Sequence, residues 1–273
     1  MIVQSAPDGQ PHFLITMAQH TRFAGALAEV FGNERFEKIS PKAEMEFVIA
    51  HHDAGWAAYD AAPGLDRETG LPYNLTRTPL DDILKTSNAS PDFNEAYHPY
   101  AGLISSMHSW GLYNGRYGLS DKVLMENFSE DQKKRIAPML DHEVGRQARL
   151  EKDLASDPDV RAWISTDKKM QNYKQLQFFD TFSLYFHMTH AANRKAMRIE
   201  HVPLTAVEDV SVTVTPVADG YVLDPFPFAE DRTEVPFEGR YLAAGECETE
   251  AALHRRLADQ AVASQSVTLL APR

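Results

Sequence analysis

Residues 47–56 constrain the fold of this chain more than any other stretch. Their sequence, FVIAHHDAGW, has helical rather than alternating character, which predicts the middle of a buried helix. Side chains four residues apart share a face of such a helix, so His52 would lie between Val48 and Trp56. A buried carboxylate such as that of Asp53 costs several kcal/mol unless it has a partner. A metal ion suits Asp and His together, and a His–Asp hydrogen bond that orders the core is the alternative.

Composition narrows the classes of protein to which the chain can belong. A length of 273 residues allows one large domain, or one domain with an appendage. The net charge of −12 argues against a general nucleic-acid surface and against docking on anionic lipid. One cysteine, Cys247, excludes an internal disulfide framework and a cysteine-rich zinc site.

The start of the chain shows no targeting signal. Residues 1–10 contain neither a basic segment nor an apolar run long enough for a signal peptide, and no stretch approaches the roughly 20 apolar residues of a membrane span. We therefore expect a cytoplasmic protein without a nucleic-acid or membrane partner. The protein could also form a homo-oligomer, which the sequence does not decide.

Two N-terminal helices are predicted. Over residues 12–31, apolar residues recur in steps of four and three, and His20 falls on that apolar stripe. The second helix begins near Pro41, includes the His-His-Asp stretch, and runs to about residue 62, before a Pro-Gly pair. A lone His on an apolar stripe is more often a hydrogen-bonded core residue than a ligand.

Further helices are expected along the next hundred residues. A short helix is predicted at 79–86, followed by a loop, and another at about 98–113 with His108 facing the core. A charged helix follows at 129–155, and its Asp-His-Glu sequence at 141–143 is interpreted as exposed. The stretch 176–186 is apolar nearly all round, which is typical of a buried helix. It contains Asp180, a second interior carboxylate.

The pattern changes after about residue 199. Alternating residues around 210–223 predict a hairpin, and extended pieces are expected near 234–243 and 266–271. We therefore predict a mainly α fold: an all-helical metal-binding domain over residues 1–199, with a small β-rich C-terminal extension over 200–273 packed on it.

The prediction of a metal site is stronger when the interior polar residues are considered together. Two buried carboxylates repel each other unless something positive lies between them, and His20, His52, Asp53 and Asp180 form a sensible shell for a divalent first-row metal. The sequence does not settle whether His51 or His52 is the ligand. We choose His52 because it directly precedes Asp53.

The order His, then His-Asp, then Asp resembles the HD superfamily of metal-dependent phosphohydrolases over roughly residues 12–190. The four motif positions carry over as His20, His52, Asp53 and Asp180. The surrounding sequence is similar to that of a bacterial HD-like family of unknown function. The resemblance implies an HD-like, all-helical core. A second metal would need further histidines, for which His108, and less readily His98, are the candidates.

The resemblance implies a metal-dependent phosphohydrolase that acts on a nucleotide or a small phosphate ester. The cofactor would be one or two divalent transition-metal ions (Fe, Mn, Zn, Ni or Co) that polarise the phosphoryl group and activate water. Asp53 or Asp180 would orient that water, and His108 would steady the developing charge or protonate the leaving group. Arg22 could meet the phosphate, but it points away from His20 on the first helix, so we expect it to be solvated.

Two alternatives remain. One is oxygen chemistry at a di-iron centre, which needs at least two further ligands. The other is a non-catalytic regulatory or binding module with a vestigial metal site. Seryl hydrolases, nucleotide kinases and zincins are disfavoured because the chain lacks their starting motifs.

Overall fold

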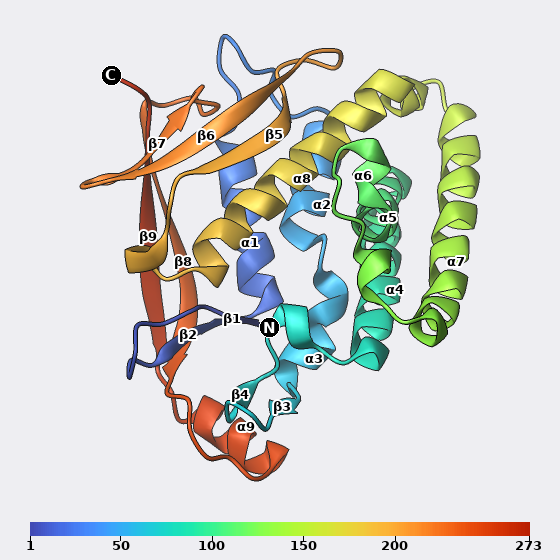
Figure 1. Ribbon diagram of the computed structural model, residues 1–273. Coiled ribbons are helices and arrows are strands. Elements are labelled where there is room, and N and C mark those ends of the chain that lie inside the picture. The colour runs from blue at the N-terminus through green and yellow to red at the C-terminus, as the bar shows by residue number, and fades with distance from the viewer.

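A seven-stranded sheet lies beside a stack of helices in the computed structural model, which describes residues 1–273 (Figure 1). About 51% of the residues are helical and 19% form strands. The prediction of a mainly α fold, with an HD-like all-helical core and only a small β-rich extension, is therefore wrong. The protein is mixed α/β, because strands from both ends of the chain join in one large curled sheet.

The helices and strands alternate unevenly along the chain. The helices are α1 (Met17–Glu29), α2 (Lys42–His51), α3 (Ala57–Ala61), α4 (Leu80–Tyr97), α5 (Pro99–Tyr113), α6 (Gly115–Gly118), α7 (Glu130–Ala155), α8 (Thr166–Met188) and α9 (Glu250–Ala258). The strands are β1 (Ile2–Val3), β2 (His12–Ile15), β3 (Leu65–Asp66), β4 (Leu71–Pro72), β5 (Met197–Pro203), β6 (Asp209–Val217), β7 (Gly220–Asp224), β8 (Arg232–Leu242) and β9 (Val262–Leu270).

The large sheet has the strand order β1-β2-β8-β9-β7-β6-β5. All neighbours are antiparallel except β7 and β9. The predicted hairpin is confirmed: β6 and β7 pair from Val217 opposite Gly220 onward. Gly220 has a φ of 145°, which an L side chain rarely adopts, so the turn requires glycine. The N-terminal β2 pairs with β8 over 200 residues away.

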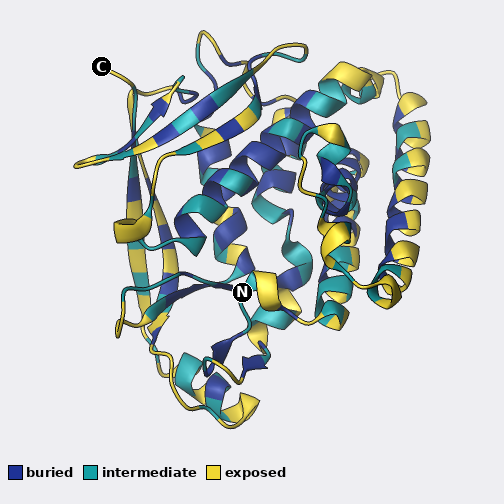
Figure 2. Ribbon diagram, viewed as in Figure 1, coloured by how far each residue is buried: buried dark blue, intermediate teal, exposed yellow.

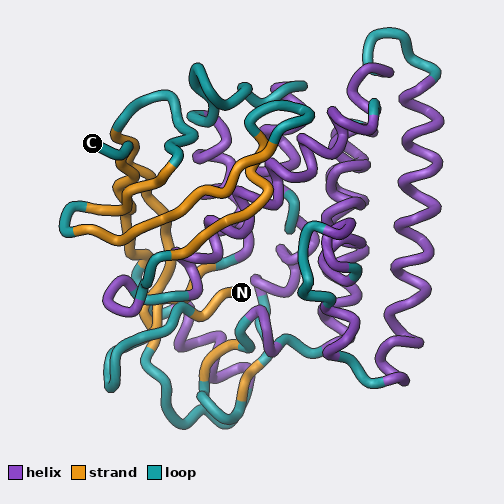
Figure 3. The backbone as a smooth tube through the Cα atoms, turned by 45° about the horizontal axis from the view of Figure 1, so that its top comes forward, coloured by secondary structure: helices purple, strands orange, loops and turns teal.

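The helices form layers on one side of the sheet. Helices α1 and α8 lie nearest to it, α2, α4 and α5 lie behind them, and α7 forms the far edge (Figures 1 and 3). Figure 2 shows the burial that follows: α8 is largely buried, whereas one face of α7 is exposed. The apolar stretch of α8 thus lies in the main hydrophobic core. No helix combines the length and hydrophobicity needed to cross a membrane.

Two predicted helices have different bounds. The predicted helix at 12–31 begins only at Met17, because residues 12–15 form β2 and the side chain of Thr16 caps α1 by accepting a hydrogen bond from the Gln19 N–H. The predicted short helix at 79–86 is also longer than expected. It continues as α4 to Tyr97 and contains Pro91.

Candidate metal centre

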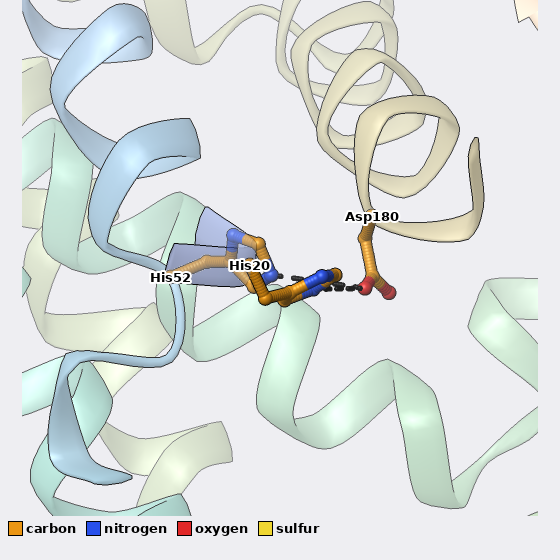
Figure 4. Close-up of side chains that lie close together, drawn as sticks. All are labelled: His20, His52 and Asp180. Carbon is orange, nitrogen blue, oxygen red and sulfur yellow. Dashed lines mark hydrogen bonds and ion pairs between the residues drawn. The ribbon is translucent and has the colours of Figure 1, made fainter. Parts of the chain in front are cut away.

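Three elements bring His20, His52 and Asp180 together inside the protein. His20 comes from α1, His52 from the turn after α2, and Asp180 from the middle of α8. Figure 4 shows the three side chains converging. The Oδ1 atom of Asp180 lies 3.2 Å from the Nε2 atom of His20 and 3.7 Å from the Nε2 atom of His52. All three residues are buried. The sequence prediction named these three, and the structure places them in one cluster.

The second helix ends at the site. The prediction that it runs to residue 62 is wrong: α2 stops at His51, and Asp53 leaves the helical range with φ of −110° and ψ of 26°. The His51 carbonyl freed by this break accepts a hydrogen bond of 2.9 Å from the Asn94 side chain. The turn directs both His52 and Asp53 to the cluster, with 3.6 Å between the Nε2 atom of His52 and the Oδ2 atom of Asp53.

The imidazole of His52 is oriented for a ligand. Its Nδ1 donates a hydrogen bond of 2.8 Å to the Ile49 carbonyl, so its Nε2 carries the lone pair toward the cluster. That Nε2 atom is buried and has no hydrogen bond, and carboxylate oxygens of Asp53 and Asp180 lie 3.6 and 3.7 Å from it. A metal-bound histidine commonly donates its other ring N–H to a backbone carbonyl, as His52 does. A ring nitrogen that faces two carboxylates in this way favours a cation, either a proton or a metal ion.

The ring of His187 contacts the ring of His20 at its Nδ1 atom. The Nδ1 atoms of the two rings lie 3.1 Å apart, which leaves the Nε2 atom of His20 for Asp180. Both rings are fully buried, and burial holds the pKa of His187 well below its ordinary value. His187 is thus a neutral imidazole that fixes the orientation of a candidate ligand.

His108 lies on the other side of His52. A ligand atom of His108 groups with those of His52 and Asp53 within 4.8 Å, and the His108 and His52 rings are 5.1 Å apart. Burial lowers the pKa of His108 to about 3. Its Nδ1 lies 2.7 Å from the amide nitrogen of Gln177. His98 is elsewhere: it caps α5, and its Nδ1 accepts the Tyr100 N–H.

The charges of the cluster are strongly coupled. Burial alone would lower the pKa of His52, but Asp53 and Asp180 reverse this effect and raise the pKa to about 9. Burial would raise the pKa of Asp180, yet the imidazoles of His20 and His52 hold it well below its ordinary value. Burial raises the pKa of Asp53. The negative field that favours a proton on His52 also favours a metal cation at the same place.

The spacing of the donors is compatible with metal binding. Two ligand atoms that each lie about 2.1 Å from an ion are roughly 3–3.5 Å apart at tetrahedral or octahedral angles. The separations of 3.2, 3.6 and 3.7 Å are close to that range. The site contains two overlapping groups of His and Asp residues that could bind a metal: His20, His52 and Asp180 form one, and His52, Asp53 and His108 form the other.

A pocket of about 450 Å³ opens beside the cluster. Asp53 lines it and is the most accessible of the acidic candidates, with 17% of its side chain exposed against 6% for Asp180. Arg22 also lines the pocket and forms no ion pair with a protein carboxylate. It is exposed, as expected, but it shares this pocket with Asp53. The helices α1 and α2 pack closely here because Gly25 lies against Ala50.

Sequence reasoning did not identify three residues around the cluster. His187 and Gln177 sit on an apolar helix with no motif to mark them. Arg116 comes from a segment where it and Tyr117 have φ of 51° and 58°, and it donates a hydrogen bond of 3.1 Å to Thr181, beside Asp180. Its flanking residues, Gly115 and Gly118, were the only signal that could have marked this turn.

The Asp-His-Glu sequence at 141–143 is not part of the cluster. Its interpretation as exposed is wrong for Glu143, which is fully buried and lies 3.1 Å from the Nε atom of Arg146. The Ser106 hydroxyl donates to the Glu143 carbonyl, which ties α7 to α5. Glu143 thus serves helix packing.

Comparisons with known proteins identify a family. No curated protein and no solved structure matches the chain. The resemblance to the HD superfamily therefore stays a prediction. A family model described as "Protein of unknown function (DUF3891)" matches residues 1–244. Because this match covers most of the 273 residues, the chain belongs to that family.

Proposed function

We propose that the protein is a metal-dependent hydrolase of phosphate esters. The proposal depends on one observation. The side chains of His20, His52 and Asp180 converge in the core, where the Nε2 atom of His52 has no hydrogen bond, next to a pocket lined by Asp53 and Arg22. A metal-binding group deep in the protein, an accessible carboxylate and an unpaired guanidinium are the parts that hydrolysis of an anionic ester needs.

The residues that would hold the ion are His20, His52 and Asp180, with Asp53 shared between the ion and the pocket. A divalent transition metal would lower the pKa of water and neutralise charge that develops on the phosphoryl oxygens. Neutral His108 is buried and does not line the pocket, so we now assign it to the ligand shell, or to a second ion, rather than to the leaving group.

Asp53 is the residue positioned to accept a proton from the attacking water. It reaches both the cluster and the pocket, so its carboxylate can accept a proton from water held there. The water oxygen forms a bond to phosphorus, its proton passes to Asp53, and the bond from phosphorus to the alcohol oxygen breaks. The departing alcohol takes a proton from solvent at the pocket mouth.

Arg22 would bind the phosphate group. It is the cation of the pocket and forms no ion pair, although Glu29 also lines the pocket. A guanidinium can donate two parallel hydrogen bonds to a phosphate, which fixes the ester relative to Asp53. The net charge of −12 does not oppose this role, because the local positive charge comes from Arg22 and the ion.

An assay of 4-nitrophenol release tests the proposal. The protein would be stripped with a chelator, reloaded separately with Mn, Fe, Zn, Ni or Co, and given 4-nitrophenyl phosphate and bis(4-nitrophenyl) phosphate, which separate monoesterase from diesterase activity. We expect activity only after reloading. Asp53→Asn should lower kcat by about 10²–10⁴-fold, whereas the matched surface variant Asp121→Asn should not change it. Activity that survives both chelation and Asp180→Asn would exclude this mechanism.

A further inference from the structure

Four nearly parallel rings lie beside the pocket. Phe47 and His51 project from α2, and Phe93 and Tyr97 project from α4, each pair separated by one helical turn. The Phe47 ring lies 3.6 Å from that of Tyr97 and 4.3 Å from that of His51, with interplanar angles of 7° and 24°. The Phe93 ring is inclined by only 8° to that of Phe47. The rings of His51 and Phe93 lie 5.6 Å apart and are inclined to each other by 30°. The four residues are here called the aromatic stack.

The aromatic stack is accessible from solvent. Phe93 and Tyr97 are each 48% exposed, and the other large exposed hydrophobic residues do not form such a stack. Aromatic pairs favour offset-stacked or edge-to-face contacts, and a cluster of exposed apolar side chains commonly marks a binding site. His51 is fixed in the stack by a hydrogen bond of 2.8 Å between its Nδ1 and the Phe47 carbonyl. Its Nε2 is left for other partners.

Two residues of the aromatic stack contribute to one wall of the pocket beside the metal centre. Phe93 and His51 line that wall, and Asp53 and Arg22 line other parts of the pocket. The remaining lining is mostly small, since it includes Gly25 and several alanines, but it also contains Glu29, and it leaves about 450 Å³ free. The pocket thus combines two aromatic side chains with Arg22, which together with a bound metal ion would offset the carboxylates of Asp53 and Glu29.

We propose that this pocket selects phosphate esters whose alcohol portion carries a planar aromatic ring. The inference rests on the function proposed above and names its substrate class. The ring stacks against Phe93 and His51, while the phosphate lies between Arg22 and Asp53. Phe93 and His51 are specificity residues rather than metal ligands: His51 is adjacent to His52 in sequence, yet it stacks on Phe47 and does not join the metal cluster.

Two non-hydrolysable probes test the inference by binding alone. Phenylphosphonate and cyclohexylphosphonate have the same charge and number of carbon atoms, but only the first has a planar ring. Calorimetric titration of metal-loaded wild-type protein should give a Kd about three- to tenfold lower for the phenyl compound, as expected for a stacking contact. Equal affinities, or no binding of either probe, would overturn the inference.

Variants of the aromatic stack separate a ring contact from general hydrophobicity. Phe93→Leu should abolish the preference for phenylphosphonate, and Phe93→Trp should keep it. Both changes are at a half-exposed position, so the fold should tolerate them. Tyr241→Leu, at an exposed tyrosine of β8, is the matched control and should leave the preference unchanged. A preference that persists in Phe93→Leu would overturn the assignment of Phe93.

Arg22→Gln locates the anionic end of the ligand. It should weaken both probes by the same factor, because it removes a contact to the phosphonate that they share. A loss confined to phenylphosphonate would overturn this placement. These titrations are independent of turnover: a stacking preference without 4-nitrophenol release would reject the hydrolase proposal alone, and 4-nitrophenol release without a preference would reject the substrate class alone.

Discussion

The Nε2 atom of His20 lies 3.2 Å from the Oδ1 atom of Asp180, although 160 positions separate the two residues in the chain. They come from α1 and α8, the helices nearest to the sheet. Both side chains are buried, so neither atom can exchange its partner for water. The pair thus defines a point in the core where a positive charge, either a proton or a metal ion, lowers the energy of the folded protein.

The metal content of purified protein should depend on His52 and Asp180. We expect one or two transition-metal ions per chain in the wild type and a large loss in His52→Asn or Asp180→Asn, because each change removes a central donor. Elemental mass spectrometry measures this. His51→Asn is the matched control and should retain the metal, since His51 lies outside the cluster. Equal metal content in all four proteins would contradict the site.

His187 should tune metal affinity without binding the ion. His187→Phe removes the contact between the two Nδ1 atoms of His187 and His20 but keeps a ring among the neighbouring phenylalanines. Affinity should fall about 10–100-fold, as for other partners that orient a ligand. Competition with a chromophoric chelator reports it. His187→Gln, which can keep a hydrogen bond, should lose less. If the Phe variant binds as tightly as wild type, His187 has no orienting role.

Gly55 should be irreplaceable in the turn that follows Asp53. A Cβ atom at this position would lie 2.3 Å from the Thr86 carbonyl oxygen and 2.6 Å from the Ser90 nitrogen, both of them backbone atoms of α4. Gly55→Ala should therefore cost about 1–3 kcal/mol of unfolding free energy. Gly145→Ala, in open space on α7, should instead add roughly 0.5–1 kcal/mol. Urea unfolding of both variants tests this contrast.

Glu143 should make stability depend on pH. Burial raises its pKa, despite the nearby Arg146, so the folded protein binds this proton more tightly than the unfolded chain does. As pH rises from the ordinary glutamate pKa through the raised value, folding loses stability, because ionisation is easier in the unfolded chain. Wild type should therefore lose stability relative to Glu143→Gln across that window. Urea unfolding at several pH values measures the difference.

The control for Glu143 is its neighbour on the same helix. Asp141 is exposed and makes no ion pair, so Asp141→Asn should follow the wild-type pH profile. If Glu143→Gln also follows that profile, the buried carboxyl group does not contribute to the pH dependence of folding.

The candidate ligands could be predicted because their surroundings in the sequence are apolar. Asp180 lies in a nearly continuous apolar run, and His20 lies on an apolar stripe, so local pattern and desolvation cost were enough to select them. The break after His51 could not be predicted in the same way. It depends on two contacts between distant segments: Asn94 of α4 donates a hydrogen bond to the His51 carbonyl, and Gly55 packs against the backbone of α4. The local sequence indicates neither contact.

The size of the large sheet was underestimated in the sequence-based prediction for a similar reason. Individual extended pieces near residues 234–243 and 266–271 were visible, but their pairing was not. Residues 12–15 looked helical because they continue the apolar stripe of α1, and pairing with β1 and β8 holds them as a strand. Strand pairing between distant segments is a tertiary property, which a local pattern does not report.

The pairing of β2 with β8 has a consequence for how the protein is made. His12 lies opposite Leu242, so β2 cannot pair with β8 until the chain has left the ribosome as far as residue 242. The segments that carry His20, His52 and Asp180 all emerge earlier, without the strand against which α1 packs. During synthesis the apolar side of α1 must therefore stay exposed to solvent or form transient, non-native contacts. A pairing so distant in sequence is expected to make folding slow, and it makes the nascent chain a natural client for chaperones.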